Sequence, residues 1–216
     1  MADLTGIAVK HTELIRKIQQ ASVFVAPIAT AIPAAFTTGA TADLTALPAA
    51  WKDVGVVTKS DAYTWSRSVN MAETTSHGFV DPTRRDITSN VTSLQFTAQE
   101  LSKVVLEQYH NVDLSAVTST VTTNEFTFSD PLAPATRFSR IIAIGQDGAG
   151  TNAIFIIRII PRAIMTAPGD QSWSDDNELT FPMEFSAVPD TVLGYSMRYV
   201  FGGPGWKALI TNMGIT

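Results

Sequence analysis

The sequence predicts a mainly β protein: an antiparallel β-sandwich or open barrel with one flanking α-helix at about 97–110, a short N-terminal helix at about 12–20, and extended arms or loops. Apolar and polar residues alternate in several separate segments, which is the period of half-buried strands. Turn-forming residues separate these segments. Only the segment 97–110 has a strong helical pattern, and strands joined by turns around one helix favour two packed sheets.

Length and composition indicate one domain that hides part of its surface. The 216 residues suit a single core, which we divide into an N-terminal segment (1–50), a β core (51–201) and a C-terminal segment (202–216). Charged residues make up 16% of the chain, below the roughly 25% of typical soluble domains. No apolar run approaches the ~20 residues of a membrane helix, and the N-terminus lacks the apolar core of a signal peptide. We therefore expect synthesis in a cytoplasm.

The N-terminal segment predicts a helix, a strand and an arm. HTELIRKIQQA has Leu14, Ile15 and Ile18 at helical spacing behind Thr12. SVFVAPI follows as a β-branched and aromatic run that Pro27 ends. Residues 29–50 are rich in Ala, Thr and Pro, so we expect an extended arm or long loop.

The middle of the chain predicts strands on either side of a helix. AYTWSRSV and TSLQFT alternate, and a long polar loop is expected between them from Asn70 to Asp86. FTAQELSKVVLEQYH has Thr97 and Glu100 at capping-box spacing, ahead of an apolar stripe.

Four further segments complete the expected sheets. NEFTFSD alternates through two phenylalanines, and RFSRIIAIGQDGAGTNAIFIIRII predicts a hairpin around a Gly-rich turn. ELTFPMEFSAV and LGYSMRYVF alternate again, although Pro182 suggests an edge strand or a bulge. FGGPGW then predicts a hinge without a helix, where the chain leaves the last strand with Trp206 as an anchor.

One strand is apolar on both faces. In IFIIRII, Phe155, Ile157 and Ile159 alternate with Ile154, Ile156 and Ile160. Antiparallel sheets normally leave one face in water, so a second cover is needed. Either the helix or another subunit supplies it.

The chain offers little chemistry. The histidines have no metal-ligand spacing, no GxSxG elbow is present, and the absence of cysteine excludes disulfides and thiolate metal sites. GQDGAG matches no phosphate-binding pattern, and DQSWSDDNE lacks EF-hand spacing. We expect no enzymatic activity, no cofactor and no metal.

Charge argues against general nucleic-acid binding. The net charge is −5, whereas such binders have a basic face. Residues 163–197 contain no Lys or Arg. The same segment contains the following acidic residues: Asp170, Asp175, Asp176, Glu178, Glu184 and Asp190.

Several ordered segments together resemble the major tail proteins, or tail tube proteins, of long non-contractile-tailed bacteriophages, especially those infecting actinobacteria. The segments, which cover most of the chain, are ELIRKIQQASVFVAPI, ALPAAWKDVGVVTKSDAYTWSRS, VTSLQFTAQELSKVVLEQYHNVDL and the run from PRAIMTAPGDQSW to FGGPGW. The likeness is weakest at 30–45 and 118–135. None of these segments is a catalytic signature.

The resemblance implies a structural virion protein that forms six-fold rings, which stack into a hollow tail tube through which DNA leaves. It implies tape measure, tail terminator and tail tip proteins as partners, and no specific DNA binding. We expect a subunit interface at Ile154, Ile156 and Trp206. The loop with His77, Arg84 and Arg85 is expected to meet acidic loops of the next ring. The candidates for an acidic lumen or rim are Asp170, Asp175, Asp176 and Glu178.

Two alternatives remain open at this point. A carbohydrate-binding or receptor-binding β-sandwich of a phage tail could use the four tryptophans to stack on sugar rings. Within the tail assignment, a tail terminator or a secretion-system tube protein is also possible.

Overall fold

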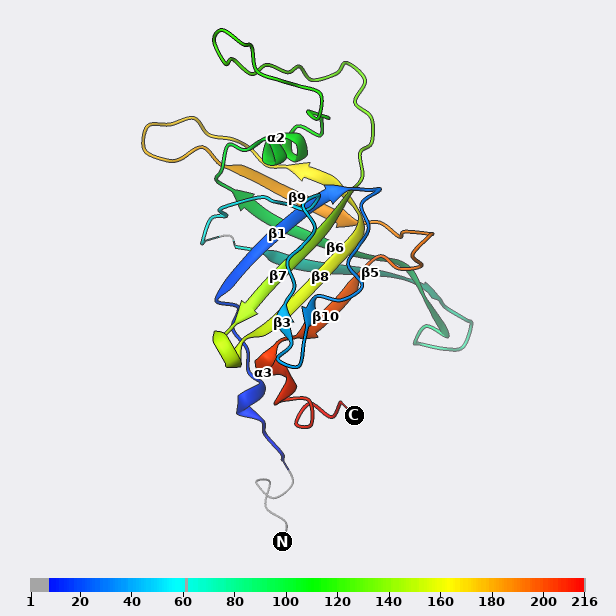
Figure 1. Ribbon diagram of the computed structural model, residues 1–216. Coiled ribbons are helices and arrows are strands. Elements are labelled where there is room, and N and C mark those ends of the chain that lie inside the picture. The colour runs from blue at the N-terminus through cyan, green and yellow to red at the C-terminus, as the bar shows by residue number, and fades with distance from the viewer. Residues whose placement is uncertain (1–7, 61, 216) are drawn as a thin grey trace.

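The computed structural model describes residues 8–60 and 62–215 and confirms a mainly β, antiparallel fold (Figure 1). The main sheet has the strand order β4-β1-β7-β8-β9-β6-β5, and β10 pairs with β8. Every strand pair in it is antiparallel. The strands are β1 (Gln20–Pro27), β2 (Thr37–Thr38), β3 (Asp43–Leu44), β4 (Lys52–Asp53), β5 (Thr64–Thr74), β6 (Arg84–Ala98), β7 (Ser139–Asp147), β8 (Ile154–Pro168), β9 (Phe181–Ala187) and β10 (Arg198–Gly202). The helices are α2 (Lys103–Tyr109) and α3 (Pro204–Lys207), with 3-10 turns η1 (Thr12–Leu14) and η2 (Gly150–Asn152).

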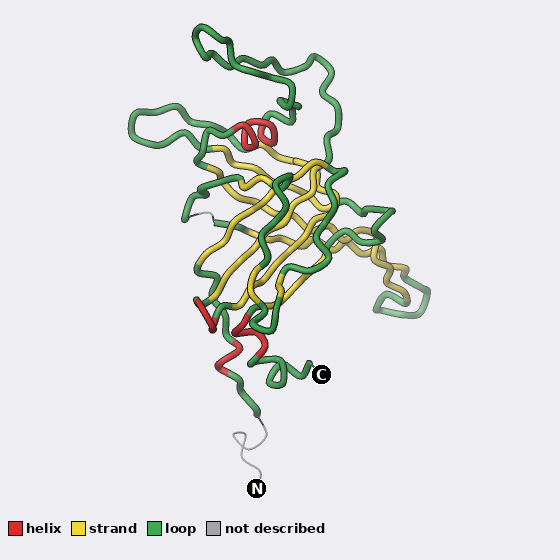
Figure 2. The backbone as a smooth tube through the Cα atoms, in the orientation of Figure 1, coloured by secondary structure: helices red, strands yellow, loops and turns green. Residues whose placement is uncertain are grey.

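Strand β8 belongs to both layers of a sandwich. Its first half pairs with β10, for example Ile157 with Val200, and its second half pairs with β9, for example Met165 with Phe185. Extra residues interrupt its pairing at Pro161 and again between Met165 and Ala167. Such bulges bend a strand and increase its twist. As a result, β9, β6 and β5 cross behind β1, β7 and β8 (Figures 1 and 2).

The main core lies between these layers. Phe96 of β6 and Phe185 of β9 are fully buried and stack with ring centroids 5.8 Å apart. They face aliphatic residues of β1, β7 and β8 in one cluster. Helix α2 closes one end of this core through Val105. The side chain of Ser102 caps the helix by accepting a hydrogen bond from the Val105 amide.

A second core explains the strand that is apolar on both faces. Phe36 of the arm and Trp51, the residue directly after it, pack against Phe155, Ile157 and Ile159 of β8. The cover is therefore the arm of the same subunit, and the expectation of a helix or another subunit on this face is wrong. The arm also contains the small β2–β3 hairpin.

Both expected helices are shorter than predicted. The helix at 97–110 is reduced to α2, because Thr97 and Ala98 still pair in β6 and Glu100 does not complete a capping box. Instead, a Glu100 carboxylate oxygen accepts a hydrogen bond from the Val56 amide at 2.8 Å. The helix at 12–20 is reduced to η1, because from Gln19 onward the backbone pairs with β7.

Three other local predictions are wrong. The polar loop from Asn70 to Asp86 is the outer part of the β5–β6 hairpin, which has a shift of register at Asn70 and Met71 and a turn between Thr74 and Arg84. NEFTFSD is a loop. Pro182 lies near the start of β9, which is paired on both sides and is not an edge strand, and the bulge in the β8–β9 pair lies in β8, between Met165 and Ala167.

The ionisation of Tyr63 offers a test of the packing between layers. Burial, assisted by the negative charge of Asp53, raises the pKa of Tyr63 to about 12, and its hydroxyl donates to the Ala21 carbonyl at 3.2 Å. In the unfolded chain the pKa is about 10. The contribution of Tyr63 to the free energy of unfolding should therefore be complete below pH 10 and be lost as pH rises from 10 to 12. Denaturant titrations at pH 9 and pH 11 measure this. The free energy of unfolding should fall more between the two pH values for the native chain than for Tyr63→Phe, and an equal fall in both would contradict the prediction.

Candidate self-assembly surfaces

An exposed aromatic face lies on β8 and β10. Pairing places Phe201 opposite Ile156 and Tyr199 opposite Arg158, so these four side chains share one face. Tyr199 is 51% exposed and Phe201 is 46% exposed. Large apolar rings exposed together are typical of interaction surfaces.

Trp206 extends this face. Gly203 adopts a positive φ of 109°, which only glycine tolerates well, and the chain then enters the short helix α3. The amide of Gly205 donates to the Ala153 carbonyl at 2.9 Å and fixes the turn. Trp206 stacks on Phe201 with ring centroids 5.2 Å apart. The segment FGGPGW is thus a change of direction, as predicted, but it also starts a helix that the sequence did not predict.

Of the three residues predicted at a subunit interface, two lie on the aromatic face and the third is buried inside the subunit. Ile156 is half-buried on the aromatic face, and Trp206 reaches the same face through Phe201. Ile154 is only 2% exposed and packs inside the subunit.

Arg158 is held between aromatic rings at the entrance to a cavity. Its guanidinium lies 4.8 Å from the Trp65 ring and 5.9 Å from the Tyr199 ring. No hydrogen bond or ion pair of this side chain is found among the described residues. The cavity has a volume of 1070 Å³ and opens between the two layers. We call it the interlayer groove; its wall includes Ile18, Val56, Lys59, Trp65, Ile156 and Arg158.

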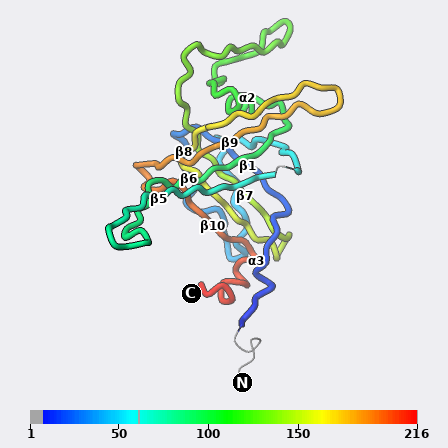
Figure 3. Tube along the Cα trace, turned by 180° about the vertical axis from the view of Figure 1, so that it is seen from behind, coloured from blue at the N-terminus to red at the C-terminus, as the bar shows by residue number. Residues whose placement is uncertain are grey.

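The β5–β6 hairpin projects from the sandwich on one side (Figures 1 and 3). His77 lies in its turn, and the two predicted arginines lie on β6. Arg84 pairs with Asp86 at 2.7 Å and Arg85 pairs with Glu73 at 2.9 Å. All of these charged groups are exposed, so the pairs hold the arginines along the hairpin without burying them.

The acidic loop between β8 and β9 projects from the opposite side (Figures 1 and 3). It carries four exposed carboxylates together with Trp173, which is 87% exposed. At its base, Gln99 donates to the Glu178 carboxylate at 2.6 Å. A backbone hydrogen bond, together with the one from Gln99, lowers the pKa of Glu178. The carboxylates are Asp170, Asp175, Asp176 and Glu178.

The outer face of the β9–β6–β5 layer is polar and nearly uncharged. Cross-strand pairing aligns Ser66 with Ser93 and Ser93 with Ser186, and the last two hydroxyls lie 3.3 Å apart. The next row contains Thr64, Gln95 and Glu184. We call this surface the hydroxyl face. It could not have been located from the sequence without knowing which strands pair.

Two strand edges of this layer are free among the described residues. β5 pairs with β6 on one side only. The segment 164–168 of β8 pairs with β9 only, because the pairing with β7 ends at Ala163. Unpaired backbone groups on such edges can accept a strand from another copy.

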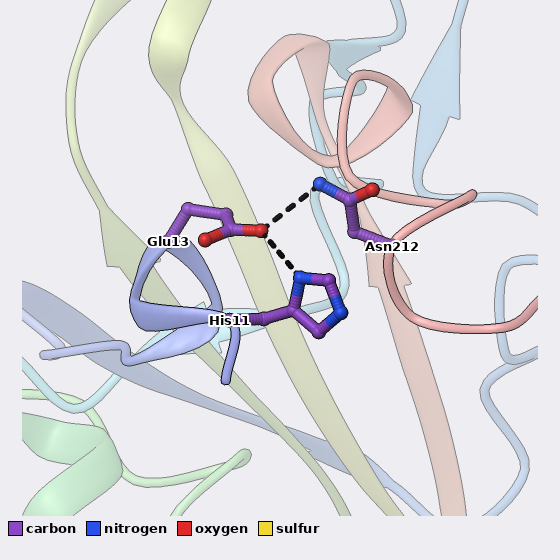
Figure 4. Close-up of polar contacts among 3 residues, drawn as sticks. All are labelled: His11, Glu13 and Asn212. Atoms are coloured by element: carbon purple, nitrogen blue, oxygen red, sulfur yellow. Dashed lines mark hydrogen bonds and ion pairs between the residues drawn. The ribbon is translucent and has the colours of Figure 1, made fainter. Parts of the chain in front are cut away.

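The N- and C-terminal segments are joined at the end of the molecule opposite α2 (Figures 1 and 4). A Glu13 carboxylate oxygen accepts a hydrogen bond from the Asn212 side chain at 3.0 Å and lies 2.8 Å from His11 Nδ1. A backbone hydrogen bond and the contact with His11 lower the pKa of Glu13.

The described residues contain no group of three or more metal-ligating side chains. No helix among them is long and apolar enough to cross a membrane.

The tryptophans do not form a common surface. Trp51 is buried with Phe36 against β8, Trp65 lies under Arg158, and Trp206 stacks on Phe201. Only Trp173 is free to stack on a sugar ring. This distribution does not favour a site built from several aromatic rings.

Comparison with known proteins gives one family. A family model described as phage tail tube protein matches residues 11–195, which include every main-sheet strand except β10. No curated protein matches the chain. Phe201 and Trp206 lie outside the matched region.

Proposed function

The chain belongs to the phage tail tube protein family, and we propose that it assembles into stacked six-fold rings that conduct DNA during ejection. The family match over residues 11–195 carries this proposal. Negative-stain microscopy of the purified chain tests it: rings or tubes of uniform diameter are expected. A chain that stays monomeric at all concentrations would contradict it.

Free strand edges supply a route to ring closure. We propose that β5 of one copy pairs with the segment 164–168 of β8 in the next copy. A repeated head-to-tail contact of this kind closes into a ring when the rotation fits. The ring would remove both edges and continue the sheet around a barrel.

The hydroxyl face fits the lining of the conduit. A basic lining would release counterions from DNA and bind its phosphates. A surface of serine, threonine and glutamine side chains offers no such attraction, and the single carboxylate of Glu184 repels phosphate.

For the acidic loop, we propose that Asp170, Asp175, Asp176 and Glu178 lie at the lumen or its rim.

The aromatic face fits the subunit interface. Ile156 and Trp206 would be covered by a neighbouring copy, while Ile154 would support the contact from inside the subunit. Aromatic rings at the centre of an interface usually contribute most of its binding energy.

We propose that His77, Arg84 and Arg85 contact the acidic loop of the next ring. Each exposed ion pair is worth only about 0–1 kcal/mol, so the contact depends on repetition around the ring. Replacing both Arg84 and Arg85 by Glu should therefore strongly impair polymerisation while leaving the subunit folded.

Sedimentation of assembled material, with circular dichroism as the check on folding, measures the effect of this double substitution. A matched control is Arg67→Glu, which also changes an exposed hairpin arginine. Tubes that form as readily as those of the native chain would exclude the contact.

Tail assembly also requires partners at the tube's inside and ends. We propose the tape measure protein, the tail terminator and the tail tip proteins, with synthesis in the host cytoplasm and a final location in the virion tail.

A further inference from the structure

The two ends of β5 lie on opposite sides of the subunit (Figures 1 and 3). The hairpin tip follows the far end of β5, whereas the interlayer groove is lined by residues at and before its start, such as Lys59 and Trp65. The hairpin tip therefore cannot reach the groove of its own chain. A contact between two different surfaces on opposite sides is heterologous, and such contacts propagate from copy to copy.

The tip presents two apolar side chains on an ordered turn. Phe79 is 69% exposed and Val80 is fully exposed. The amide of Thr83 donates to the Thr74 carbonyl at 2.9 Å, and the Phe79 amide donates to the Ser76 carbonyl at 3.2 Å. These bonds fix the turn before any partner arrives, so docking needs little further ordering.

The groove offers a complementary surface. Ile18 and Val56 are substantially exposed on its wall, and the half-buried Ile156 also lines it. Its two carboxylates are occupied by backbone amides: Asp53 accepts from Gly55 at 3.0 Å and Glu100 accepts from Val56 at 2.8 Å.

No hydrogen bond or ion pair to the side chains of Lys59 and Arg158, two of the cations that line the groove, is found in the part of the chain that the structure describes. Arg158 lies against the rings of Trp65 and Tyr199, and Lys59 is exposed. The groove therefore suits an apolar segment that carries a carboxylate. The tip contains one next to its apolar pair, at Asp81.

We propose that the hairpin tip of one copy docks in the interlayer groove of a neighbouring copy, with Phe79 and Val80 on the apolar wall and Asp81 toward Arg158. This inference rests on the proposed self-assembly and names the surfaces that carry it. The acidic loop borders the groove, because Gln99 bonds both the Val56 carbonyl and Glu178. One hairpin can thus place its tip in the groove and its arginines beside the acidic loop.

Disulfide trapping tests the contact, because the chain contains no cysteine. Val80→Cys and Lys59→Cys are combined in one chain, both at exposed positions. Mild oxidation of assembled material should give a ladder of covalent oligomers, whereas each single variant should stay monomeric on denaturing gels. Tubes that form but give no ladder would overturn the inference.

A complementation experiment tests the direction of docking. A tip variant, Phe79→Asp with Val80→Asp, should need at least a tenfold higher concentration to assemble. The control Val121→Asp changes an equally exposed apolar residue on the loop after α2 and should assemble normally. A groove variant, Val56→Asp with Lys59→Glu, should fail in the same way as the tip variant.

Mixing the two defective variants should give heterodimers, because each retains one functional surface. Tip variants that assemble like the native chain would overturn the docking but leave the tube proposal intact. If the native chain itself forms no rings, the proposed function fails instead.

Discussion

Trp206→Ala is expected to leave the subunit folded and to raise the concentration needed for assembly by roughly 30-fold, since an aromatic interface anchor is worth about 2 kcal/mol. Within the subunit the ring stacks on Phe201, which is itself half exposed. Stacking of that kind contributes about 1 kcal/mol, so the loss of folding stability should be small. Light scattering during dilution measures the assembly threshold, and thermal melting measures the fold.

A control separates this effect from the loss of any exposed apolar side chain. Leu132→Ala removes a fully exposed residue on the loop after α2 and should not change the threshold. If Trp206→Ala assembles at the same concentration as the native chain, the aromatic face is not a subunit interface.

If the hydroxyl face lines the tube as proposed, lysines on it are expected to make the tube retain DNA. Ser66 and Gln95 belong to this face, and Ser68 lies two residues along β5 from Ser66 and so on the same side. All three are exposed, and lysine at these positions should leave strand pairing intact. Each ring would present many cations to the duplex. Binding that neutralises 6–10 phosphates weakens by about 10³–10⁵-fold between 50 and 200 mM salt. Co-sedimentation of tubes with duplex DNA should therefore show strong retention that salt abolishes.

The matched control places three lysines outside the sandwich, at Thr118, Ser119 and Thr122, which are exposed on the loop after α2. These tubes should bind less DNA than the hydroxyl-face variant and should not impede its passage. Equal retention by both variants would mean that the hydroxyl face does not line the lumen.

Most strands could be predicted from the sequence because alternation is a local signal. β1, β7, β8, β9 and β10 all coincide with alternating or β-branched runs. The ends of the helices could not be predicted in this way, since they depend on contacts with residues far away in the sequence. Thr97 and Glu100 have capping-box spacing. In the fold, however, the backbone of Thr97 pairs with β9, and the carboxylate of Glu100 accepts a hydrogen bond from the Val56 amide.

The candidate surfaces were only partly predictable. The alternation of LGYSMRYVF places Tyr199 and Phe201 on one face, but only the pairing of β10 with β8 brings Ile156 to that face. Nothing local indicates that the arm covers the other side of β8. The arm's anchors, such as Phe36 and Trp51, are isolated in a segment of small residues, so their contact depends on the tertiary fold.

The sharing of β8 between both layers has a mechanical consequence. The first half of β8 pairs with β10 in one layer and its second half pairs with β9 in the other. The layers therefore cannot slide past each other without breaking hydrogen bonds along β8. Each subunit should therefore be stiff in shear. A tail that curves would take up the strain at the joints between subunits, where contacts can lengthen on one side and shorten on the other.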